Sequence, residues 1–385
     1  MSIIFISHKY PPAIGGMEKQ SFELINGFKR VSFCHQLIYD GNENFMLWIF
    51  KLRSRIKKII LKNAEVDTIH LNDGLMATIF LLLVGKPLGV KIFVTFHGLD
   101  VTFPFWIYQK VILNKLKKYD GFICISRATK QACLDRGFEQ YKLSVIANGV
   151  SIDQKNESND EEESNFDNIL KKNGISPKDQ KLLVCIGRPV KRKGFVWFAK
   201  EVLPHLPHDY RLVHVGNSSY KKSYLKHFMP EGWSTLVDLL LGTPSDAIGL
   251  RILSEDKALD NPLILLGQVS NGLKNYLIKN SHAVIIPNIR VKGDMEGFGL
   301  VALEAAILGA RVLAADLEGL QDAIVNGKNG LLLKSEDANI WKNAITVLEN
   351  QTACDAEQII SFTKSNYSWK QMVINYKNTF NENSL

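Results

Sequence analysis

The stretch Glu296-Gly-Phe-Gly-Leu-Val-Ala-Leu-Glu304-Ala decides how this chain is interpreted. It places two carboxylates on either side of a glycine-rich turn, and the apolar residues and alanines from Leu300 to Leu308 predict a helix that begins near Gly299. Gly297 and Gly299 carry no side chain, so a ligand can approach the backbone closely. The free N–H groups at the start of a helix attract anions, and the helix dipole adds to that attraction.

Glu296 and Glu304 are expected to bind hydroxyl groups, because a carboxylate repels phosphate. Hydroxyls on either side of an anion are the layout of a nucleotide sugar, in which a diphosphate joins a sugar to a ribose. The preceding Ala283-Val-Ile-Ile-Pro287 predicts a buried strand that leads into this loop. A solvated glutamate before the helix and a surface glutamate within it is the plainer alternative, and the two glycines weigh against it.

Five further motifs occur in order along nearly the whole chain, and with Glu296–Glu304 they resemble the signature of retaining GT-B glycosyltransferases, specifically glycosyltransferase family four. Each is weak alone, and the order makes the set strong. They are Tyr10-Pro-Pro-Ala-Ile-Gly-Gly-Met-Glu18, Phe96-His-Gly-Leu-Asp100, Ile146-Ala-Asn-Gly-Val150, Gly187-Arg-Pro-Val-Lys-Arg-Lys-Gly194 and Gly319-Leu-Gln-Asp-Ala-Ile-Val-Asn-Gly-Lys-Asn-Gly-Leu331.

The resemblance implies an α/β protein with the GT-B fold, in which two facing Rossmann-like domains hold the active site in the interdomain cleft. Ligands of such sheets lie beyond the carboxyl ends of the strands, which is where the motifs fall. We expect an N-terminal acceptor domain over residues 1–150, an acidic linker over 151–181 and a C-terminal donor domain over 182–363. A helix within 364–385 is expected to cross back to the first domain.

Length and composition agree with this organisation. A chain of 385 residues, 46% hydrophobic and 22% charged, is typical of a soluble globular protein with two domains. Residues 1–150 carry 20 Lys and Arg against 11 Asp and Glu, whereas the remainder carries 27 against 28. This asymmetry favours an anionic membrane or a phosphate-bearing acceptor near the first half over nucleic acid, for which no recognition motif is present.

The N-terminal segment and the cysteines indicate the compartment. Met1–Ser7 lacks the basic and long apolar regions of a signal peptide, and Ala77–Phe96 is interrupted by Lys86-Pro87 and Lys91, so no membrane span is expected. We therefore expect a cytoplasmic protein, at most located at the inner face of the cytoplasmic membrane. The cysteines show no metal-ligand spacing and are expected to be reduced; they are Cys34, Cys124, Cys133, Cys185 and Cys354.

Strands alternate with helices along both halves, which predicts parallel sheets covered on both faces. The expected helices are Glu18–Lys29, Phe45–Lys62, Trp106–Lys118 and Trp369–Phe380. Residues 151–172 are polar and acidic and predict an exposed linker or loop, and 217–262 are expected to form an insertion with a helix or two. The expected strands are Ser2–Ser7, Ile92–Phe96, Gly121–Ile125, Leu182–Gly187, Arg211–Gly216, Leu263–Gly267, Ala283–Pro287, Arg311–Ala315 and Gly330–Leu333.

A leaving diphosphate needs positive charge, and the resemblance implies that Arg188 and Lys193 supply it. Arginine can contact two phosphate oxygens, while lysine acts as a point charge. The alternative is a solvated basic loop, because Lys191 and Arg192 are basic as well. No Asp-x-Asp pair occurs in the chain, so we expect neither a metal clamp nor another cofactor.

The resemblance also assigns further site residues. Residues expected to contact the sugar or act in the reaction are His97, Glu296, Arg188 and Lys193. Residues expected to bind the rest of the donor, partly through their backbone, are Gly15, Gly16, Asn148, Gln268, Val269, Gly297, Phe298, Gly299, Leu300, Val301 and Glu304. Asp100 and Ser126 are weaker candidates.

The segment Phe45–Lys62 is apolar and basic at helical spacing. Phe45, Trp48, Leu52 and Ile56 can share one face, with basic residues at its sides. This pattern fits a helix that lies in a membrane interface, and it also fits a surface helix packed on the sheet, so both interpretations stay open.

The sequence thus predicts a retaining glycosyltransferase that needs no metal. It would move a hexose-type sugar from a UDP- or GDP-linked donor to a glycan or lipid-linked acceptor. The resemblance implies a role in cell-surface polysaccharide or lipopolysaccharide synthesis, because members of the family most often act there. The alternatives are a catalytically inactive nucleotide-sugar-binding subunit and a GT-B sugar-nucleotide epimerase. A dinucleotide-dependent oxidoreductase is disfavoured because no Gly-x-Gly-x-x-Gly follows a strand.

Overall fold

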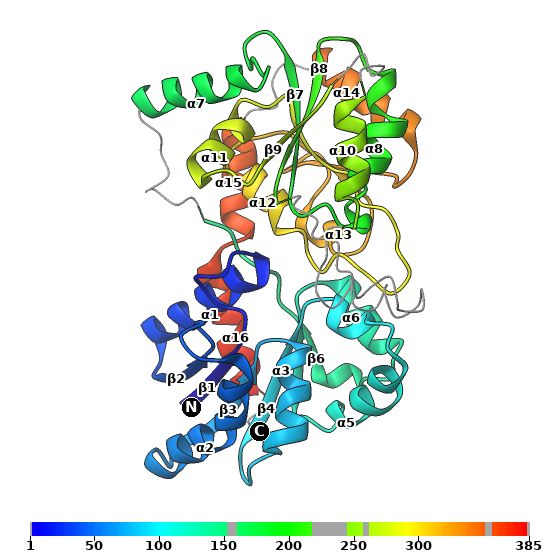
Figure 1. The fold of residues 1–385 in the computed structure, drawn as a ribbon. Coiled ribbons are helices and arrows are strands. Elements are labelled where there is room, and N and C mark those ends of the chain that lie inside the picture. The colour runs from blue at the N-terminus through cyan, green and yellow to red at the C-terminus, as the bar shows by residue number, and fades with distance from the viewer. Residues whose placement is uncertain (1, 152–159, 218–244, 257–261, 351–355, 383–385) are drawn as a thin grey trace. The chain divides into compact units, whose positions relative to one another are not determined.

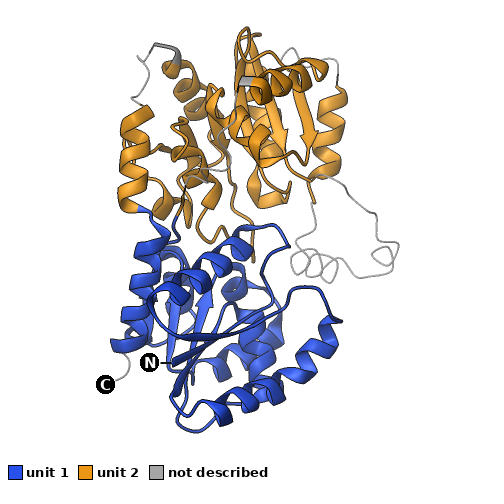
Figure 2. Cartoon of the chain, turned by 90° about the vertical axis from the view of Figure 1, so that its left-hand side faces the viewer, with its two compact units in different colours: residues 1–149, 367–385 blue, residues 150–366 orange. Residues whose placement is uncertain are grey.

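The computed structural model describes residues 2–151, 160–217, 245–256, 262–350 and 356–382 (Figure 1). The chain divides into two compact units, which are coloured separately in Figure 2. Unit 1 comprises Met1–Gly149 and Tyr367–Leu385, and unit 2 comprises Val150–Asn366. Each unit is built on one six-stranded sheet.

The sheet of unit 1 has the strand order β2-β1-β3-β4-β5-β6, and every neighbouring pair is parallel. Its inner strands are apolar and buried, as strands covered on both faces require. Its strands are β1 (Ser2–Ser7), β2 (Cys34–Ile38), β3 (Val66–Leu71), β4 (Lys91–Phe96), β5 (Gly121–Cys124) and β6 (Leu143–Val145).

Helices follow nearly every strand of unit 1, as parallel connections demand. The helix expected over Trp106–Lys118 is present over residues 106–116, with the π-helical turn η2 inside it and α5 at its end. The helical elements are α1 (Gly16–Val31), α2 (Phe45–Lys62), α3 (Gly74–Ile79), η1 (Phe80–Val84), α4 (Leu99–Thr102), η2 (Tyr108–Ile112), α5 (Leu113–Leu116), α6 (Arg127–Leu134), η3 (Gln140–Lys142) and α16 (Trp369–Glu382).

Helix α2 begins and ends where the sequence predicts, and its packing decides between the two interpretations of its apolar face. The side chain of Asn44 accepts hydrogen bonds from the N–H groups of Met46 and Leu47 and so caps the helix. Trp48, Leu52 and Ile56 are buried in the core of unit 1. The face that the sequence offered to a membrane is therefore packed against the protein.

The C-terminal helix α16 packs beside α1 within unit 1 (Figure 1). Phe380 lies against the rings of Phe5, Phe28 and Phe93. A side chain on Gly149 would reach within 2.3 Å of the backbone nitrogen of Trp369, so only glycine admits the start of this helix.

The sheet of unit 2 has the order β12-β11-β10-β7-β8-β9, again with parallel pairs. Its strands are β7 (Lys181–Ile186), β8 (Tyr210–Val215), β9 (Leu263–Gly267), β10 (Ala283–Ile286), β11 (Val312–Ala315) and β12 (Leu331–Leu333). The helical elements are α7 (Asp160–Lys172), η5 (Lys191–Lys193), α8 (Phe195–Glu201), η6 (Leu203–His205), α10 (Ala247–Glu255), α11 (Asn271–Lys279), α12 (Leu300–Ala306), α13 (Leu320–Ala323), α14 (Ala338–Asn350) and α15 (Ala356–Asn366).

The prediction of an exposed linker or loop over 151–172 is wrong for most of its length, because Asp160–Lys172 form helix α7. Leu170 is fully buried, and Phe166 packs on Tyr276 of α11, whose hydroxyl donates to Asp167 at 2.6 Å. Glu161 and Glu162 are exposed, whereas Phe166 and Leu170 attach the helix to the rest of unit 2.

Parts of two other expectations lie outside the described residues. Of the expected insertion over 217–262, the structure describes only Asn217, 245–256 and Pro262, which include helix α10 beside α8. Cys354 is not described, and the other four cysteines are free. In the described part of the chain, no helix is long and apolar enough to cross a bilayer.

Candidate active site

The loops that follow β7 and β10 of unit 2 are joined through their backbones. Gly194 adopts a φ of +66°, and a side chain there would come within 1.9 Å of the carbonyl oxygen of Pro287. The N–H of Ile289 donates to the carbonyl of Arg192 at 2.9 Å. This close approach places the basic turn η5 directly against the loop that carries Glu296.

Glu296 is the centre of the side chains gathered there. It is only 8% exposed, and its Oε2 accepts from Nζ of Lys193 at 2.5 Å, from Nδ2 of Asn288 at 2.9 Å and from Nη1 of Arg192. Nε of Arg192 also lies 3.1 Å from Oδ1 of Asp294. No described residue donates to Oε1 of Glu296, so this oxygen can accept from a ligand hydroxyl.

The charges of this cluster favour an ionised Glu296. Burial acts to raise its pKa, but the cations of Arg192 and Lys193 outweigh burial and hold the pKa far below the usual value. Burial lowers the pKa of Lys193, and its attraction to Glu296 offsets only part of that effect. The pKa of Asp294 is raised, chiefly by burial.

The backbone of Glu296 is held as firmly as its side chain. Its N–H donates to Oε2 of Glu318 at 2.6 Å, and its carbonyl accepts from the N–H of Gly319 at 3.1 Å. Glu318 has a φ of +52°, which is uncommon for a residue with a side chain. A side chain on Gly319 would come within 2.2 Å of the carbonyl oxygen of Gly297, so this glycine allows the two loops to touch.

The helix predicted after the glycine turn is present as α12, with Gly299 in the left-handed region at its start, at a φ of +88°. Gly297, Phe298 and Gly299 are buried, and Leu300 and Val301 are half-buried in the first turn. Glu304 lies within the helix, where its Oε2 is 3.3 Å from Nζ of Lys274 of α11. Gln268 and Val269 follow β9, with Gln268 exposed.

The two basic residues chosen from the sequence differ in their positions. Lys193 contacts Glu296, but Arg188 is exposed and makes no ion pair with that carboxylate; Arg192 occupies this place instead. The sequence pattern places Arg192 only in a solvated basic loop, and it does not single out Asn288, Asp294 or Glu318. Asn288 was accessible to prediction, because it lies two residues after a buried strand, at the carboxyl end of the sheet.

In unit 1, His97 is held at the end of β4. Its backbone N–H donates to both carboxylate oxygens of Asp100, at 2.8 and 3.1 Å. Its ring nitrogen Nε2 lies 2.8 Å from the carbonyl oxygen of Asn72. A carbonyl can only accept, so Nε2 carries a proton and a neutral His97 offers Nδ1 as an acceptor. Asp100 also accepts from the N–H of Gly74 at 3.1 Å and thereby ties the β3 loop to the β4 loop.

Several titratable side chains lie on the loops and strands around this histidine. Burial raises the pKa of Asp100 to about 6, although His97 and the two N–H donors act in the opposite direction. Burial, helped by His97, lowers the pKa of His70 to about 3, so His70 stays neutral behind the site. Nδ1 of His8 lies 3.1 Å from Oδ2 of the buried Asp73. The loop ends after β1, β3 and β4 thus form one polar group of side chains.

The remaining candidates of unit 1 are spread over its strand ends. Gly15 and Gly16 are exposed at the start of α1, and a side chain on Gly15 would meet Glu18. Asn148 is buried, and no described group donates to its Oδ1. Ser126 caps α6 by accepting from the N–H of Thr129 at 3.1 Å, which gives it a structural role.

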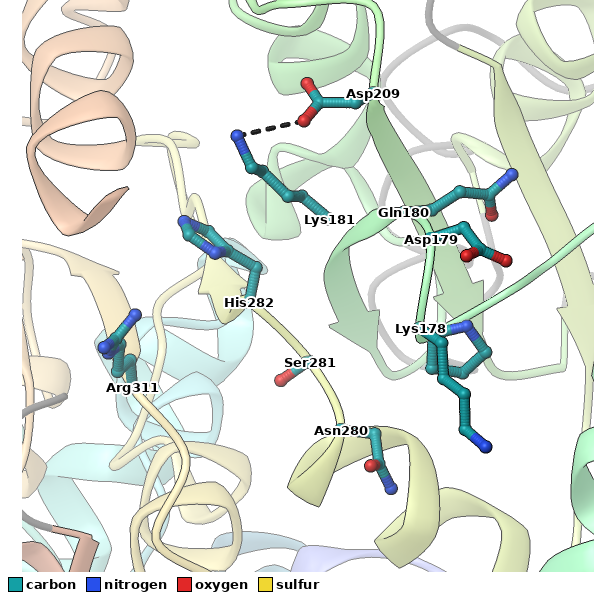
Figure 3. Close-up of a pocket in the computed structure, with 10 residues that line it drawn as sticks. Lys178, Asp179, Gln180, Lys181, Asp209, Asn280, Ser281, His282 and Arg311 are labelled. Atoms are coloured by element: carbon teal, nitrogen blue, oxygen red, sulfur yellow. Dashed lines mark ion pairs between the residues drawn. The ribbon is translucent and has the colours of Figure 1, made fainter. Parts of the chain in front are cut away.

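A pocket of unit 2 lies at the opposite, amino-terminal ends of its strands (Figure 3). Lys181, His282 and Arg311 lie at the starts of β7, β10 and β11. Lys181 is already paired with Asp209 at 2.9 Å, and Lys178 and Arg311 lie on opposite sides of the pocket (Figure 3). These side chains do not converge, so we place the candidate site at the Glu296 cluster. No group of three or more potential ligand side chains able to hold a metal ion occurs among the described residues.

Two family models match the chain. Residues 166–365 match the model described as Glycosyl transferases group 1, and residues 12–154 match the model described as Glycosyltransferase Family 4. The first match alone spans more than half of the chain. The chain therefore belongs to the glycosyl transferases group 1 family, and it is a glycosyltransferase with the GT-B fold.

Curated relatives agree with this assignment. An uncharacterized glycosyltransferase of Methanocaldococcus jannaschii is 24% identical over 403 residues, which cover 97% of this chain and 96% of the relative. A second one from the same organism is 25% identical over 283 residues, 71% of this chain, and the match spans only 62% of that relative's length.

Solved structures show the same fold at low identity. HepE of Anabaena in complex with UDP-glucose has a TM-score of 0.70 and 16% identity, over 99% of this chain and 100% of its own. The lipopolysaccharide outer core galactosyltransferase WaaB, in its apo form, has a TM-score of 0.63 and 18% identity, over 99% of each chain.

Proposed function

We propose that this glycosyltransferase moves a hexose-type sugar from a UDP- or GDP-linked donor to a glycan or lipid-linked acceptor, with retention of configuration and without a metal. The observation that carries the proposal is the Glu296 cluster. A buried ionised carboxylate with one oxygen free to accept, next to Lys193, offers a hydroxyl acceptor and a phosphate cation side by side.

The roles of the individual residues follow from the resemblance. Glu296 binds hydroxyls of the transferred sugar, Lys193 and Arg188 stabilise the leaving diphosphate, and Glu304 accepts from the ribose. The N–H groups of Leu300 and Val301, beyond Gly297, Phe298 and Gly299, receive the distal phosphate, and the backbone of Gln268 and Val269 contacts the base. In unit 1 the proposal assigns sugar contact to His97 and donor contacts to Gly15, Gly16 and Asn148.

A UDP-linked donor is supported by the complex of HepE, a protein of similar fold, with UDP-glucose. A setting in lipopolysaccharide synthesis is supported in the same way by WaaB, a lipopolysaccharide outer core galactosyltransferase of similar fold. The proposal extends this setting to other cell-surface polysaccharides and to the inner face of the cytoplasmic membrane. These likenesses concern proteins under 20% identical, so they guide the choice of substrates for testing.

An anionic or membrane-bound acceptor is supported by the outer stripe of α2, which we define as Met46, Phe50, Arg53, Lys57 and Leu61. Phe50 and Leu61 are 66% and 75% exposed, and Arg53 and Lys57 are exposed between them. Apolar and basic side chains on one exposed helical face suit an anionic interface. We propose this stripe as the membrane-facing side of α2, because the apolar face that the sequence suggested for that role is packed in the core of unit 1.

The proposal is tested by binding and turnover together. Calorimetry with UDP and GDP selects the base, and hydrolysis assays on matching nucleotide sugars select the donor. Lys193→Ala and Arg188→Ala should each lower turnover by about a hundredfold or more, because a preorganised cation is lost. EDTA should leave the rate unchanged. Activity that disappears with EDTA and returns with manganese would contradict the metal-free mechanism.

A further inference from the structure

Arg192 is a partly buried cation to which the proposed function assigns no contact with the donor. Its guanidinium lies between two carboxylates, with Nε 3.1 Å from Asp294 and Nη1 donating to Oε2 of Glu296. Its own carbonyl accepts from the N–H of Ile289 at 2.9 Å. Its side chain is fixed by two acidic partners, and its backbone is fixed by the neighbouring loop.

Lys193 shares the same carboxylate oxygen but is held more loosely. Its Nζ lies 2.5 Å from Oε2 of Glu296, and its side chain makes no other hydrogen bond or ion pair to the described residues. The lysine side chain is a flexible stem that can redirect a point charge, whereas the planar guanidinium of Arg192 fits two acceptors at once. One cation of the pair is therefore fixed and the other can move.

We propose that Arg192 is the fixed counter-ion of Glu296, which allows Lys193 to leave the carboxylate for the donor diphosphate. The inference rests on the proposed function, because it takes Lys193 to be a diphosphate-binding residue. Arg192 acts here as a positioning residue. It keeps Glu296 ionised and in place for the sugar and does not touch the donor itself.

The neighbourhood of Glu296 explains why a second cation is needed. The acidic groups that face it are Asp294 on its own loop and Glu318 on the loop after β11. Without Arg192, departure of Lys193 would leave Glu296 buried beside these acids. Asn288 would then be the one side chain of the described residues that donates to it. A buried carboxylate without a cation is strongly disfavoured, so Lys193 would remain bound to it.

The titration behaviour of the two cations agrees with this division. For Arg192, burial acts to lower the pKa, but Glu296 and Asp294 outweigh burial and raise it. For Lys193, burial prevails and the pKa is lowered. The geometry points the same way, because Arg192 contacts two carboxylates and Lys193 contacts one.

The test compares nucleoside diphosphate binding by the full-length chain and its variants, using calorimetry with UDP or GDP, whichever the wild type binds. Arg192→Gln should weaken binding about tenfold, because Lys193 stays on Glu296. The double variant Arg192→Gln with Glu296→Gln should bind within about threefold of the wild type, because no carboxylate then retains Lys193. Glu296→Gln alone should bind the diphosphate at least as tightly as the wild type.

Two further variants separate this role from a general loss of charge or of structure. Lys191→Gln removes the same charge from an exposed neighbour on the same turn and should leave binding unchanged. Arg192→Lys retains a cation and should bind within about threefold of the wild type. If Arg192→Gln is unstable, this conservative variant and the charge-neutral double variant still report on the inference.

Two results would overturn the inference. One is wild-type binding by Arg192→Gln. The other is a double variant as weak as Arg192→Gln, which would mean that Arg192 contacts the diphosphate directly or only supports the fold. If the wild type binds neither UDP nor GDP, the proposed function fails and this inference fails with it.

Discussion

The strand-end loops of unit 2 and unit 1 hold their candidate residues by different means. In unit 2, Glu296 is held by two cations and an amide on its side chain. In unit 1, His97 is held by the carboxylate of Asp100 on its N–H and by a backbone carbonyl on its ring. The first arrangement is ionic, whereas the second fixes the position of an imidazole ring through a backbone N–H and a backbone carbonyl.

This difference indicates which properties each region controls. Under the proposed function, a phosphate that enters unit 2 would compete with Glu296 for Lys193, so binding there would depend on the balance of charges. A substitution near His97 instead changes loop geometry, because Asp100 joins the N–H groups of His97 and Gly74. Ionic control, by the charges around Glu296 in unit 2, can be tested separately from positional control, by the hydrogen bonds around His97 in unit 1. The largest effect is expected at the backbone contact that holds the Glu296 cluster together.

Gly194→Ala should be the most damaging of these changes. Alanine would have to adopt a φ of +66° and would place Cβ within 1.9 Å of the carbonyl oxygen of Pro287. The left-handed conformation alone costs about 1–2 kcal/mol, and the clash must separate η5 from the Glu296 loop. We expect a loss of about 3 kcal/mol or more in the free energy of unfolding, measured with urea, together with weaker binding of UDP or GDP.

Gly174→Ala is the matched control in the same unit. Gly174 has a φ of +74°, and a side chain there would meet nothing within 4 Å. Gly174→Ala should therefore lower the free energy of unfolding only by the cost of the left-handed conformation, about 1–2 kcal/mol. Equal losses for the two variants would mean that the contact with Pro287 does not hold the cluster together.

Much of the fold could be predicted because local signals and tertiary packing agree. The bounds of α2 were predicted correctly, since Asn44 provides a cap and the buried face repeats at helical spacing. The apolar strands of unit 2 were predicted to within a residue for the same reason. Strand β3 was missed because Thr68 and His70 interrupt its apolar pattern, and both are buried. Nε2 of His70 lies 2.8 Å from Oγ1 of Thr95.

Helix α7 shows how composition can mislead. The run of acidic residues after Asn159 suggested a linker, but Phe166 and Leu170, four residues apart, form an apolar side that packs on unit 2. That spacing was present in the sequence and received too little weight against the charge. Where a few apolar residues recur at helical spacing, they determine the structure more than their acidic neighbours do.

Single residues of the site could be predicted from the sequence, but the contacts between them could not. The sequence pointed to Glu296 and Lys193, which the structure brings within 2.5 Å. It could not decide which of Lys191, Arg192 and Lys193 face inward, because that depends on the short turn η5 and on the contact of Gly194 with Pro287. Tertiary contacts of this kind leave no periodic pattern in a sequence.

Asp100→Asn tests the positional control in unit 1 and should have an intermediate effect. The folded pKa of Asp100, about 6, lies above its ordinary value of 3.8, so the native state holds the proton more tightly between these values. Its contribution to stability is therefore present below about pH 4 and is lost as the pH rises through about 6. Asparagine cannot ionise, so the variant does not lose stability in this way as the pH rises.

The variant should thus gain stability relative to the wild type as the pH rises from about 4 to 7, by about 1–2 kcal/mol after allowance for partial exposure. Urea unfolding at several pH values, with hydrogen exchange of β4 peptides to locate the effect in unit 1, would measure it. A constant difference between the two proteins would show that the pKa of Asp100 is the same in the folded and the unfolded chain, so that burial does not hold its proton.

The smallest effect is expected at the outer stripe of α2, where unit 1 would meet its acceptor. Each basic residue near an anionic surface contributes about 1 kcal/mol, less at physiological salt. Arg53→Ser with Lys57→Ser should therefore weaken binding to vesicles of anionic phospholipid about tenfold at low salt, and Phe50→Ser should weaken it further by removing an exposed ring. Cosedimentation would measure the binding, and hydrolysis of the donor in solution should stay near normal.

Lys51 provides the control on the same helix. Its Nζ lies 3.1 Å from Glu43, which also binds Arg55, so part of its charge is already neutralised. Lys51→Ser should consequently weaken vesicle binding less than either Arg53→Ser or Lys57→Ser. If all three act alike, net charge alone is responsible and the stripe has no special role. If the wild type ignores anionic vesicles at low salt, a purely saccharide acceptor becomes the better proposal, because the ionic control would then be confined to unit 2.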